Sequence, residues 1–225
     1  MVNRETLVFV DYFNRAQALT TTPGSSGWTV KDTSSGGTPT YLVATGDGGG
    51  MVLTLDNTSE AQIATMYHND VLCFDWRTLQ NVEIIASVTG IDAVTTLVLG
   101  MAGAQNDTAD TVATNAWFRM QGSVSTTAVV CETDDAVTDN DDKATGKTLA
   151  GTLKTFVIDF SKGISDIRFY IDGEPVATAT TFSMSGLSAG LNAQPFVQLQ
   201  KASGTGTPAV RIKKFRIQYT EASGA

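Results

Sequence analysis

The chain is poor in the residues on which many enzyme active sites depend. Its 225 residues include one histidine and two cysteines. A Ser-His-Asp or Cys-His catalytic set would have to use His68, because there is no second imidazole. No cluster of histidine and cysteine offers a zinc site either. The sequence therefore argues against nucleophilic and zinc-assisted catalysis.

The two cysteines, Cys73 and Cys131, lie in apolar runs with the character of strands. Cysteine is among the residue types most often buried. The N-terminal residues lack the apolar core and the small-residue cleavage site of a secretory signal. We therefore expect two free, buried thiols, with a disulfide as the alternative, in a protein made in a cytoplasm.

Positive charge and long apolar segments are also scarce. The 23 acidic and 15 basic residues give a net charge of −8. Sequence-independent binding to nucleic acid depends on neutralising phosphates with lysine and arginine, and anionic membranes make the same demand. No run approaches the roughly 20 apolar residues of a membrane-spanning helix. We expect neither nucleic acid nor a membrane as a partner.

The abundant residues point to strands and turns. Threonine is frequent, there are 21 glycines, and no long apolar stripe has the 3.6-residue period of a helix. A chain of this length can bury one sizeable core, and β-sandwiches of this size are commonly single domains. The composition predicts an all-β domain with little helix.

The clearest strand pattern lies in residues 153–200. Every second residue is apolar in Phe156–Phe160 and again in Ile167–Ile171, so each segment should have one buried face. The Asp172-Gly173 pair supplies the positive φ angles that a tight hairpin needs. The pattern is typical of a half-buried antiparallel sheet.

The phrase F-V-I-D-F … I-R-F-Y-I-D-G-E-P-V in residues 156–176 resembles the concanavalin A-like (laminin G-like) jelly-roll superfamily. The resemblance extends over roughly residues 28–219 and implies a two-sheet antiparallel jelly-roll sandwich in residues 28–225. Residues 1–27 are then either an arm and linker or an edge strand of the sandwich. The same fold carries lectins, glycosidases and structural modules.

Three further segments are similar to structural proteins of tailed bacteriophages. They are D-T-S-S-G-G-T-P-T-Y at residues 32–41, E-T-D-D at 132–135 and I-K-K-F-R-I at 212–217. This resemblance implies a non-enzymatic virion protein that decorates the capsid or sits in a head fibre. Its partners would be the major capsid protein or another virion protein, and copies of itself, for which we expect a trimer. The alternative is a glycan-binding module of a tail fibre or a cell-surface protein.

An acidic run is the best candidate for chemistry. Six carboxylates lie close together in sequence, those of Glu132, Asp134, Asp135, Asp139, Asp141 and Asp142. Oxygen ligands at this density can hold Ca²⁺. We expect either a calcium site at Glu132, Asp134, Asp135, Asp139 and Asp141 or a solvated acidic loop, because EF-hand spacing is lacking. No other cofactor is expected.

The same run argues against a glycosidase. Glycosidases of this superfamily carry their nucleophile and acid/base on one strand, as E-x-D-x-E or E-x-D-x-x-E. Glu132-Thr133-Asp134 supplies the first half, but Ala136 and Val137 stand where the second glutamate belongs. The missing carboxylate predicts that the chain is not an enzyme.

A glycan site is the third candidate. Trp117, Arg119 and Gln121 share one strand face, so they should point outward if Phe118 and Met120 face the core. An exposed tryptophan beside polar groups is a possible platform for a sugar ring. The alternative is that Trp117 packs against the opposite edge or against a long loop.

Two segments are candidates for partner contact. A short apolar run near the N-terminus, separated from the sandwich by a Gly/Ser/Pro-rich loop, must pair with its own sheet, another subunit or a capsid protein. The basic C-terminal strand is either solvated as an outer strand or docks against an acidic partner, with a bulge near Lys213. The predicted contact residues are Leu7, Val8, Phe9, Val10, Arg211, Lys213 and Lys214.

Overall fold

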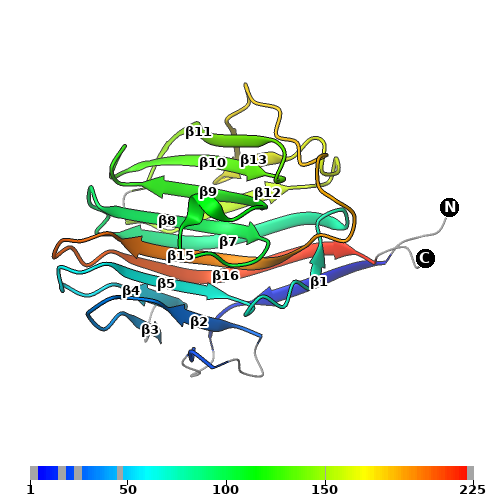
Figure 1. Ribbon diagram of the computed structural model, residues 1–225. Helices are drawn as coiled ribbons and strands as arrows, with labels where there is room; N and C mark the ends of the chain where they lie inside the picture. Colours follow the sequence, from blue (N-terminus) through cyan, green and yellow to red (C-terminus); the bar gives the residue numbers. More distant parts are fainter. Residues whose placement is uncertain (1–4, 15–18, 23–26, 45–47, 150, 222–225) are drawn as a thin grey trace.

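The computed structural model describes residues 5–14, 19–22, 27–44, 48–149 and 151–221. They form two antiparallel sheets of eight strands each, packed face to face (Figure 1). In this part of the chain the 3-10 helix η1 (Ala109–Thr111) is the single helix, and no helix there is long and apolar enough to cross a membrane. The all-β prediction is confirmed.

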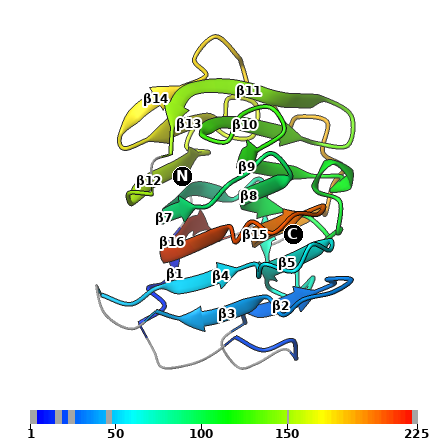
Figure 2. The same cartoon turned by 90° about the vertical axis from the view of Figure 1, so that its left-hand side faces the viewer.

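The first sheet lies on the left in Figure 2, where the labels of β12, β7 and β16 stand. In spatial order it contains β14 (Glu174–Val176), β13 (Arg168–Ile171), β12 (Lys154–Asp159), β7 (Leu79–Thr89), β16 (Ala209–Thr220), β4 (Met51–Thr54) and β3 (Thr40–Val43), and β1 (Thr6–Asp11) also pairs with β16.

The second sheet lies on the right in Figure 2. Its spatial order is β11 (Asp139–Thr148), β10 (Ala128–Asp134), β9 (Asn115–Gln121), β8 (Thr95–Ala102), β15 (Asn192–Lys201), β5 (Gln62–Tyr67) and β2 (Thr29–Asp32), and β6 (Phe74–Asp75) also pairs with β15.

The main core fills the space between the sheets, as the alternating pattern predicts. Phe156 and Ile158 of β12 are fully buried, and the Phe156 ring lies 5.0 Å from that of Phe118 on the opposite sheet, centroid to centroid. The predicted hairpin joins β13 to β14, with φ of +52° at Asp172 and +82° at Gly173. Periodicity and turn chemistry thus placed this region correctly.

The N-terminal apolar run forms β1 and pairs with β16 of the chain's own first sheet. Phe9 turns inward, with its ring centroid 6.0 Å from that of Phe74. Val8 and Val10 lie on the outer face and are exposed. Within the predicted arm, residues 1–4, 15–18 and 23–26 lie outside the described residues. Contact of this strand with a partner stays a prediction.

The basic C-terminal strand is not an outer strand, which corrects the expectation. β16 lies between β7 and the pair β4 and β1, because its apolar residues are needed in the centre of the sheet. The predicted bulge is present between Ile212 and Lys214. Lys214 Nζ lies 2.7 Å from Glu83 Oε1, and Arg211 Nη2 donates to the Gly49 carbonyl at 2.6 Å. These cations therefore have partners within the fold.

The cysteines are both free. Cys131 is buried in β10, as expected. Cys73 is exposed, so the expectation of a second buried thiol is wrong. It follows the turn after β5 and precedes β6, and therefore lies outside the strands that shape the core.

One lysine joins two connections between the sheets. Lys201 is almost fully buried, and its Nζ donates to the carbonyl oxygens of Asp56, Gly204 and Gly206. Asp56 lies between β4 and β5, and the two glycines lie between β15 and β16. Both connections cross from one sheet to the other. The ammonium group of Lys201 thus holds the β4–β5 and β15–β16 connections together.

Candidate active site

Strand alternation in β9 and β10 sets the polar face of the candidate site. Phe118 and Cys131 face the core between the sheets, so Trp117 and Glu132 face the outer side of the second sheet. Trp117 and Glu132 are directly opposite each other in the ladder. Because Asn115 and Arg119 are two residues from Trp117 on the same strand, they lie on the same face.

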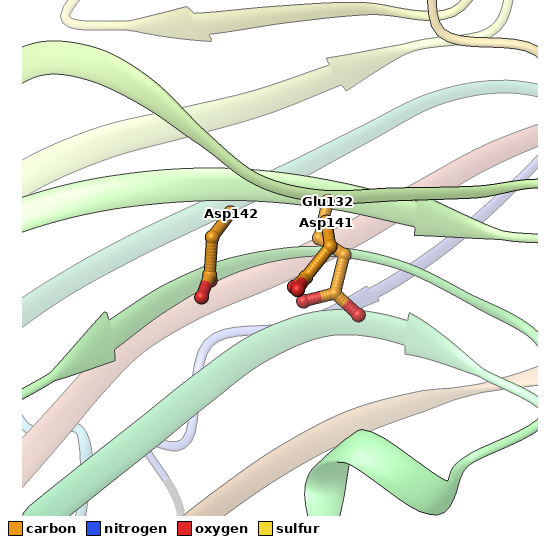
Figure 3. Close-up of side chains that lie close together, drawn as sticks. All are labelled: Glu132, Asp141 and Asp142. Atoms are coloured by element: carbon orange, nitrogen blue, oxygen red, sulfur yellow. The ribbon is translucent and has the colours of Figure 1, made fainter.

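A bulge in β11 brings two more carboxylates to Glu132. Cys131 pairs with Lys143 and Thr133 pairs with Asn140, so two residues of β11 face Glu132. Bulges redirect side chains and occur often beside active sites. The carboxylate oxygens of Glu132, Asp141 and Asp142 lie within 4.8 Å of one another, on the same side of the strands (Figure 3). Asp142 has a φ of +46°, the left-handed conformation that the bulge imposes.

Arg119 supplies the positive charge of this cluster. Its Nη1 lies 2.6 Å from Asp110 Oδ1 and 3.5 Å from Glu132 Oε2. The Oδ1 atoms of Asp142 and Asp141 lie at 3.5 and 3.7 Å from the same nitrogen. Burial alone would lower the pKa of Arg119, but the nearby carboxylates raise it above its usual value. The guanidinium therefore stays charged among four acids.

Glu132 is the perturbed acid of the cluster. Burial raises the pKa of its carboxyl group to about 7, although Trp117, Arg119 and a 2.9 Å hydrogen bond from Asn115 Nδ2 act in the opposite direction. Glu132 is 4% exposed, whereas the side chain of Asp141 is 59% exposed. Desolvation disfavours the charged form of an acid. Two neighbouring carboxyl groups thus have different environments, which is how one site can hold both an acid and a base.

Four buried polar atoms in this cluster lack a well-aligned hydrogen bond with the described residues, although Trp117 and Arg119 lie close enough to Glu132 to lower its pKa. The four atoms are Asn115 Oδ1, Trp117 Nε1, Arg119 Nε and Glu132 Oε2. Two are donors and two are acceptors, which is the complement of water or of sugar hydroxyl groups. Buried polar groups in folded proteins normally have a partner. The cluster is therefore suited to a hydroxylated ligand.

The connection between β8 and β9 covers this face of the sheet. Ala109 and Val112 of this connection pack with Trp117 and Phe196. The ring centroids of Trp117 and Phe196 are 6.0 Å apart. Gln198 Nε2 donates to the Asn106 carbonyl at 2.8 Å, Asp110 pairs with Arg119, and Lys31 pairs with Asp107, so the connection is held at several points.

This cover removes the predicted exposed platform. Trp117 points to the outer face, as the alternation predicts, but it is 0% exposed. Arg119 is buried in the carboxylate cluster, and Gln121 is half-buried at the end of β9. The alternative in which Trp117 packs against a long loop describes its position.

The structure separates the residues of the predicted calcium site. Asp134 accepts the Ala136 N–H at 2.8 Å, and Asp135 accepts the N–H groups of Thr138 and Gly186, both at 2.6 Å. These carboxylates thus close the turn between β10 and β11. Asp139 lies outside the three-residue group, in which Glu132 and Asp141 meet Asp142 instead. Glu132, Asp141 and Asp142 could together hold a metal ion, with the Arg119 guanidinium beside them, so calcium binding stays a prediction.

His68 lies in a different, aromatic environment. Its ring centroid is 4.8 Å from that of Trp28 and 5.4 Å from that of Phe9, and its Nδ1 lies 3.7 Å from Cys73 Sγ. Burial lowers the pKa of His68 to about 4. A neutral imidazole beside a thiol whose own pKa is raised by burial is not an activated nucleophile pair.

We expect His68 to make the protein sensitive to acid. Its folded pKa lies below the ordinary 6.5, so this part of the stability is complete above pH 6.5 and is lost as the pH falls towards 4. His68→Phe, which suits the aromatic surroundings, should lose less unfolding free energy than the natural protein between pH 7 and 4.5. Urea unfolding at both pH values measures this. Equal losses in the two proteins would contradict it.

Comparisons with known proteins agree on the fold. No protein-family model and no curated protein sequence matches the chain, but 188 chains of solved structures do. A Bacteroides ovatus glycoside hydrolase of family 16 from a mixed-linkage glucan locus, in complex with an oligosaccharide product, has a TM-score of 0.62 at 14% identity, over 93% of this chain and 99% of that one.

Two other matches have similar coverage. A non-specific endo-β-1,3(4)-glucanase of the same family, SCLam, gives a TM-score of 0.62 at 12% identity over 98% of this chain and 93% of that one. The Crh5 transglycosylase gives 0.53 at 17% identity over 97% and 85%. The chain therefore has the concanavalin A-like jelly-roll sandwich that the sequence predicts.

The same matches contradict two functional expectations. The matched proteins are carbohydrate-active enzymes, whereas we expected a non-enzymatic structural protein of a phage particle and no enzyme. The resemblance to phage, virion and capsid decoration proteins finds no support among them. At 12–17% identity, the likeness establishes the shared fold. The activity has to be argued from the chain's own residues.

Proposed function

We propose that the protein is a carbohydrate-active enzyme that cleaves or transfers glycosidic bonds in a β-glucan or a related polysaccharide. The observation that carries the proposal is the pairing of Glu132, with a pKa of about 7, and Asp141, whose carboxylate lies within 4.8 Å. The activities in the names of the matched structures, endo-glucanase and transglycosylase, support the choice of substrate class.

One carboxylate oxygen of Glu132 and one of Asp141 lie within 4.8 Å of each other, and this closeness supports retention of configuration. Retaining glycosidases hold their two carboxyl groups about 5–5.5 Å apart, whereas inverting enzymes leave roughly 6.5–9.5 Å for a water molecule. Burial raises the pKa of Glu132 to about 7, so its carboxyl group can carry a proton near neutral pH and serve as the acid. Asp141 is exposed, and water stabilises its charge, so it can serve as the nucleophile.

Two steps follow from these roles. In the first, Glu132 gives its proton to the leaving glycosidic oxygen while an Asp141 oxygen bonds to the anomeric carbon. In the second, the Glu132 carboxylate takes a proton from water or from a sugar hydroxyl group, whose oxygen displaces Asp141 from that carbon. Water gives hydrolysis, and a sugar acceptor gives transfer. Both carboxyl groups return to their starting states.

Substrate access requires the connection between β8 and β9 to move. Glu132 is covered, and Asp110 of that connection pairs with Arg119 beside it. Opening the connection breaks the ion pair between Asp110, which is 60% exposed, and the buried Arg119, and it uncovers the apolar contacts of Ala109 and Val112 with Trp117. A bound sugar would have to replace these contacts.

The test is cleavage of mixed-linkage β-glucan and laminarin, followed by release of reducing ends and by analysis of the oligosaccharide products. Glu132→Gln and Asp141→Asn should each lower the rate at least about 100-fold, because each removes one of the two reacting groups. Asp139→Asn is the matched control, since Asp139 lies on the same strand outside the cluster. Absence of products from both polysaccharides, or full activity in Asp141→Asn, would refute the proposal.

A further inference from the structure

A hollow lies at the edge of the first sheet, away from the carboxylate cluster. It has a volume of about 410 Å³ and lies between β13, β14 and the segment that follows β14. β14 is only three residues long, and the chain turns away at Ala177, where φ is +51°. It returns to the sheet at the bridge between Ile167 and Phe182. The hollow is the gap between these two points of attachment.

One wall of the hollow is apolar and contains the side-chain rings of a tyrosine and a proline. Phe169 and Ile171 of β13 face the core, so Arg168 and Tyr170 face outward on the same side of the strand. Pro175 of β14 is directly opposite Tyr170 in the ladder. Since Tyr170 and Pro175 both line the hollow, they offer adjacent ring surfaces on one face of the sheet.

The rim of the hollow is polar and close to electrically neutral. Arg168 Nε lies 3.2 Å from Asp166 Oδ1, and Arg168 Nη2 lies 2.7 Å from Asp166 Oδ2. This two-point pairing holds the guanidinium and the carboxylate in fixed orientations. Each carboxylate oxygen keeps further acceptor capacity. Thr178, Thr180 and Thr181 also line the hollow.

We propose that this hollow binds a neutral saccharide. Its volume falls in the range of small-ligand sites, about 300–1,000 Å³, which combine apolar walls with a few fixed polar groups. A sugar ring has an apolar C–H face for Tyr170 and Pro175, and hydroxyl groups for Asp166, Arg168 and the threonines. An anion is disfavoured, because Asp166 offsets the charge of Arg168 and the whole chain carries −8.

This inference is independent of the proposed catalysis. The hollow belongs to the first sheet, and the carboxylate cluster belongs to the second. The choice of a saccharide rests on the lining of the hollow. A site of this kind would hold a polysaccharide chain on the protein without taking part in bond cleavage.

The experiment is native affinity electrophoresis in gels that contain mixed-linkage β-glucan, xylan or galactomannan. The Glu132→Gln protein serves as the parent, so that no probe is cleaved. At least one probe should retard the parent protein. Tyr170→Ala in this background should bind that probe at least about fivefold more weakly. Arg168→Gln should also weaken binding of that probe. Tyr12→Ala removes another exposed tyrosine, outside the hollow, and should leave binding unchanged.

The outcomes separate the two proposals. Retardation by none of the three probes, or equal binding by the Tyr170→Ala and Tyr12→Ala proteins, would overturn the saccharide site. Binding that depends on Tyr170, together with a lack of glucanase activity in the natural protein, would support the saccharide site and sink the proposed catalysis. Because Tyr170 lies outside the main core, its variant should keep the parent's melting temperature to within a few degrees, which circular dichroism checks.

Discussion

At pH 8, the Glu132→Gln protein should unfold at a higher temperature than the natural protein, although it should have lost its activity. The folded pKa of Glu132, about 7, lies above the ordinary value of 4.5. Ionising this carboxyl group therefore lowers the stability of the fold. The cost is absent below pH 4.5, grows as the pH rises and is complete above pH 7, at roughly 3 kcal/mol. Glutamine cannot ionise, so the variant does not lose this stability at high pH.

The measurement is the melting temperature of both proteins at pH 5 and pH 8. The two should differ little at pH 5, and the variant should melt several degrees higher at pH 8. Glu174→Gln, at an exposed position on β14, is the control and should show no pH-dependent gain. The same gain at both pH values would mean that the effect of the glutamine does not come from ionisation. A gain in stability with a loss of activity is typical of a functional group held in an unfavourable environment.

Trp117→Ala should lower the unfolding free energy by about 3–5 kcal/mol, as expected for removal of a buried tryptophan. The ring lies between Phe196 and the residues of the covering connection. Gly100 is opposite Trp117 in the ladder, and a Cβ there would lie 2.6 Å from Trp117 Cα. The surroundings are thus shaped around this side chain and cannot fill the space that alanine leaves.

Urea unfolding at pH 7 measures this loss directly. Tyr12→Ala, an exposed aromatic substitution, should cost less than about 1 kcal/mol and is the matched control. If Trp117→Ala cost no more than Tyr12→Ala, the covering connection would not rest on Trp117 in solution. The face of the second sheet would then be open, as an exposed sugar platform requires.

The sequence predicted those parts of the fold that depend on short-range pattern. Alternation identified the buried faces of β12 and β13, and the Asp172-Gly173 pair identified their turn to β14. The bulge in β16 was also predictable, because Ile212 falls out of phase with the apolar residues that follow. These features are properties of a few neighbouring residues, so no knowledge of distant contacts is needed.

The candidate site depends on contacts that a sequence does not reveal. Glu132 was recognised, but its partner carboxylate was sought on the same strand, and β10 ends at Asp134. Ala136 lies in the turn, with a φ of +66°. Asp141 reaches Glu132 only through the register of β11 and its bulge. Trp117 was assigned to the correct face, but its burial depends on the fold of a separate connection. Asp110 was missed for the same reason.

The position of Lys201 has a consequence for the lifetime of the folded state. Its ammonium group binds Asp56, which is 145 residues away in sequence. Contacts of such long range are formed late, after the closure of large loops has been offset by other interactions. An interaction absent from the transition state for folding slows unfolding without accelerating folding. We therefore expect Lys201 to slow the separation of the two sheets without accelerating their assembly.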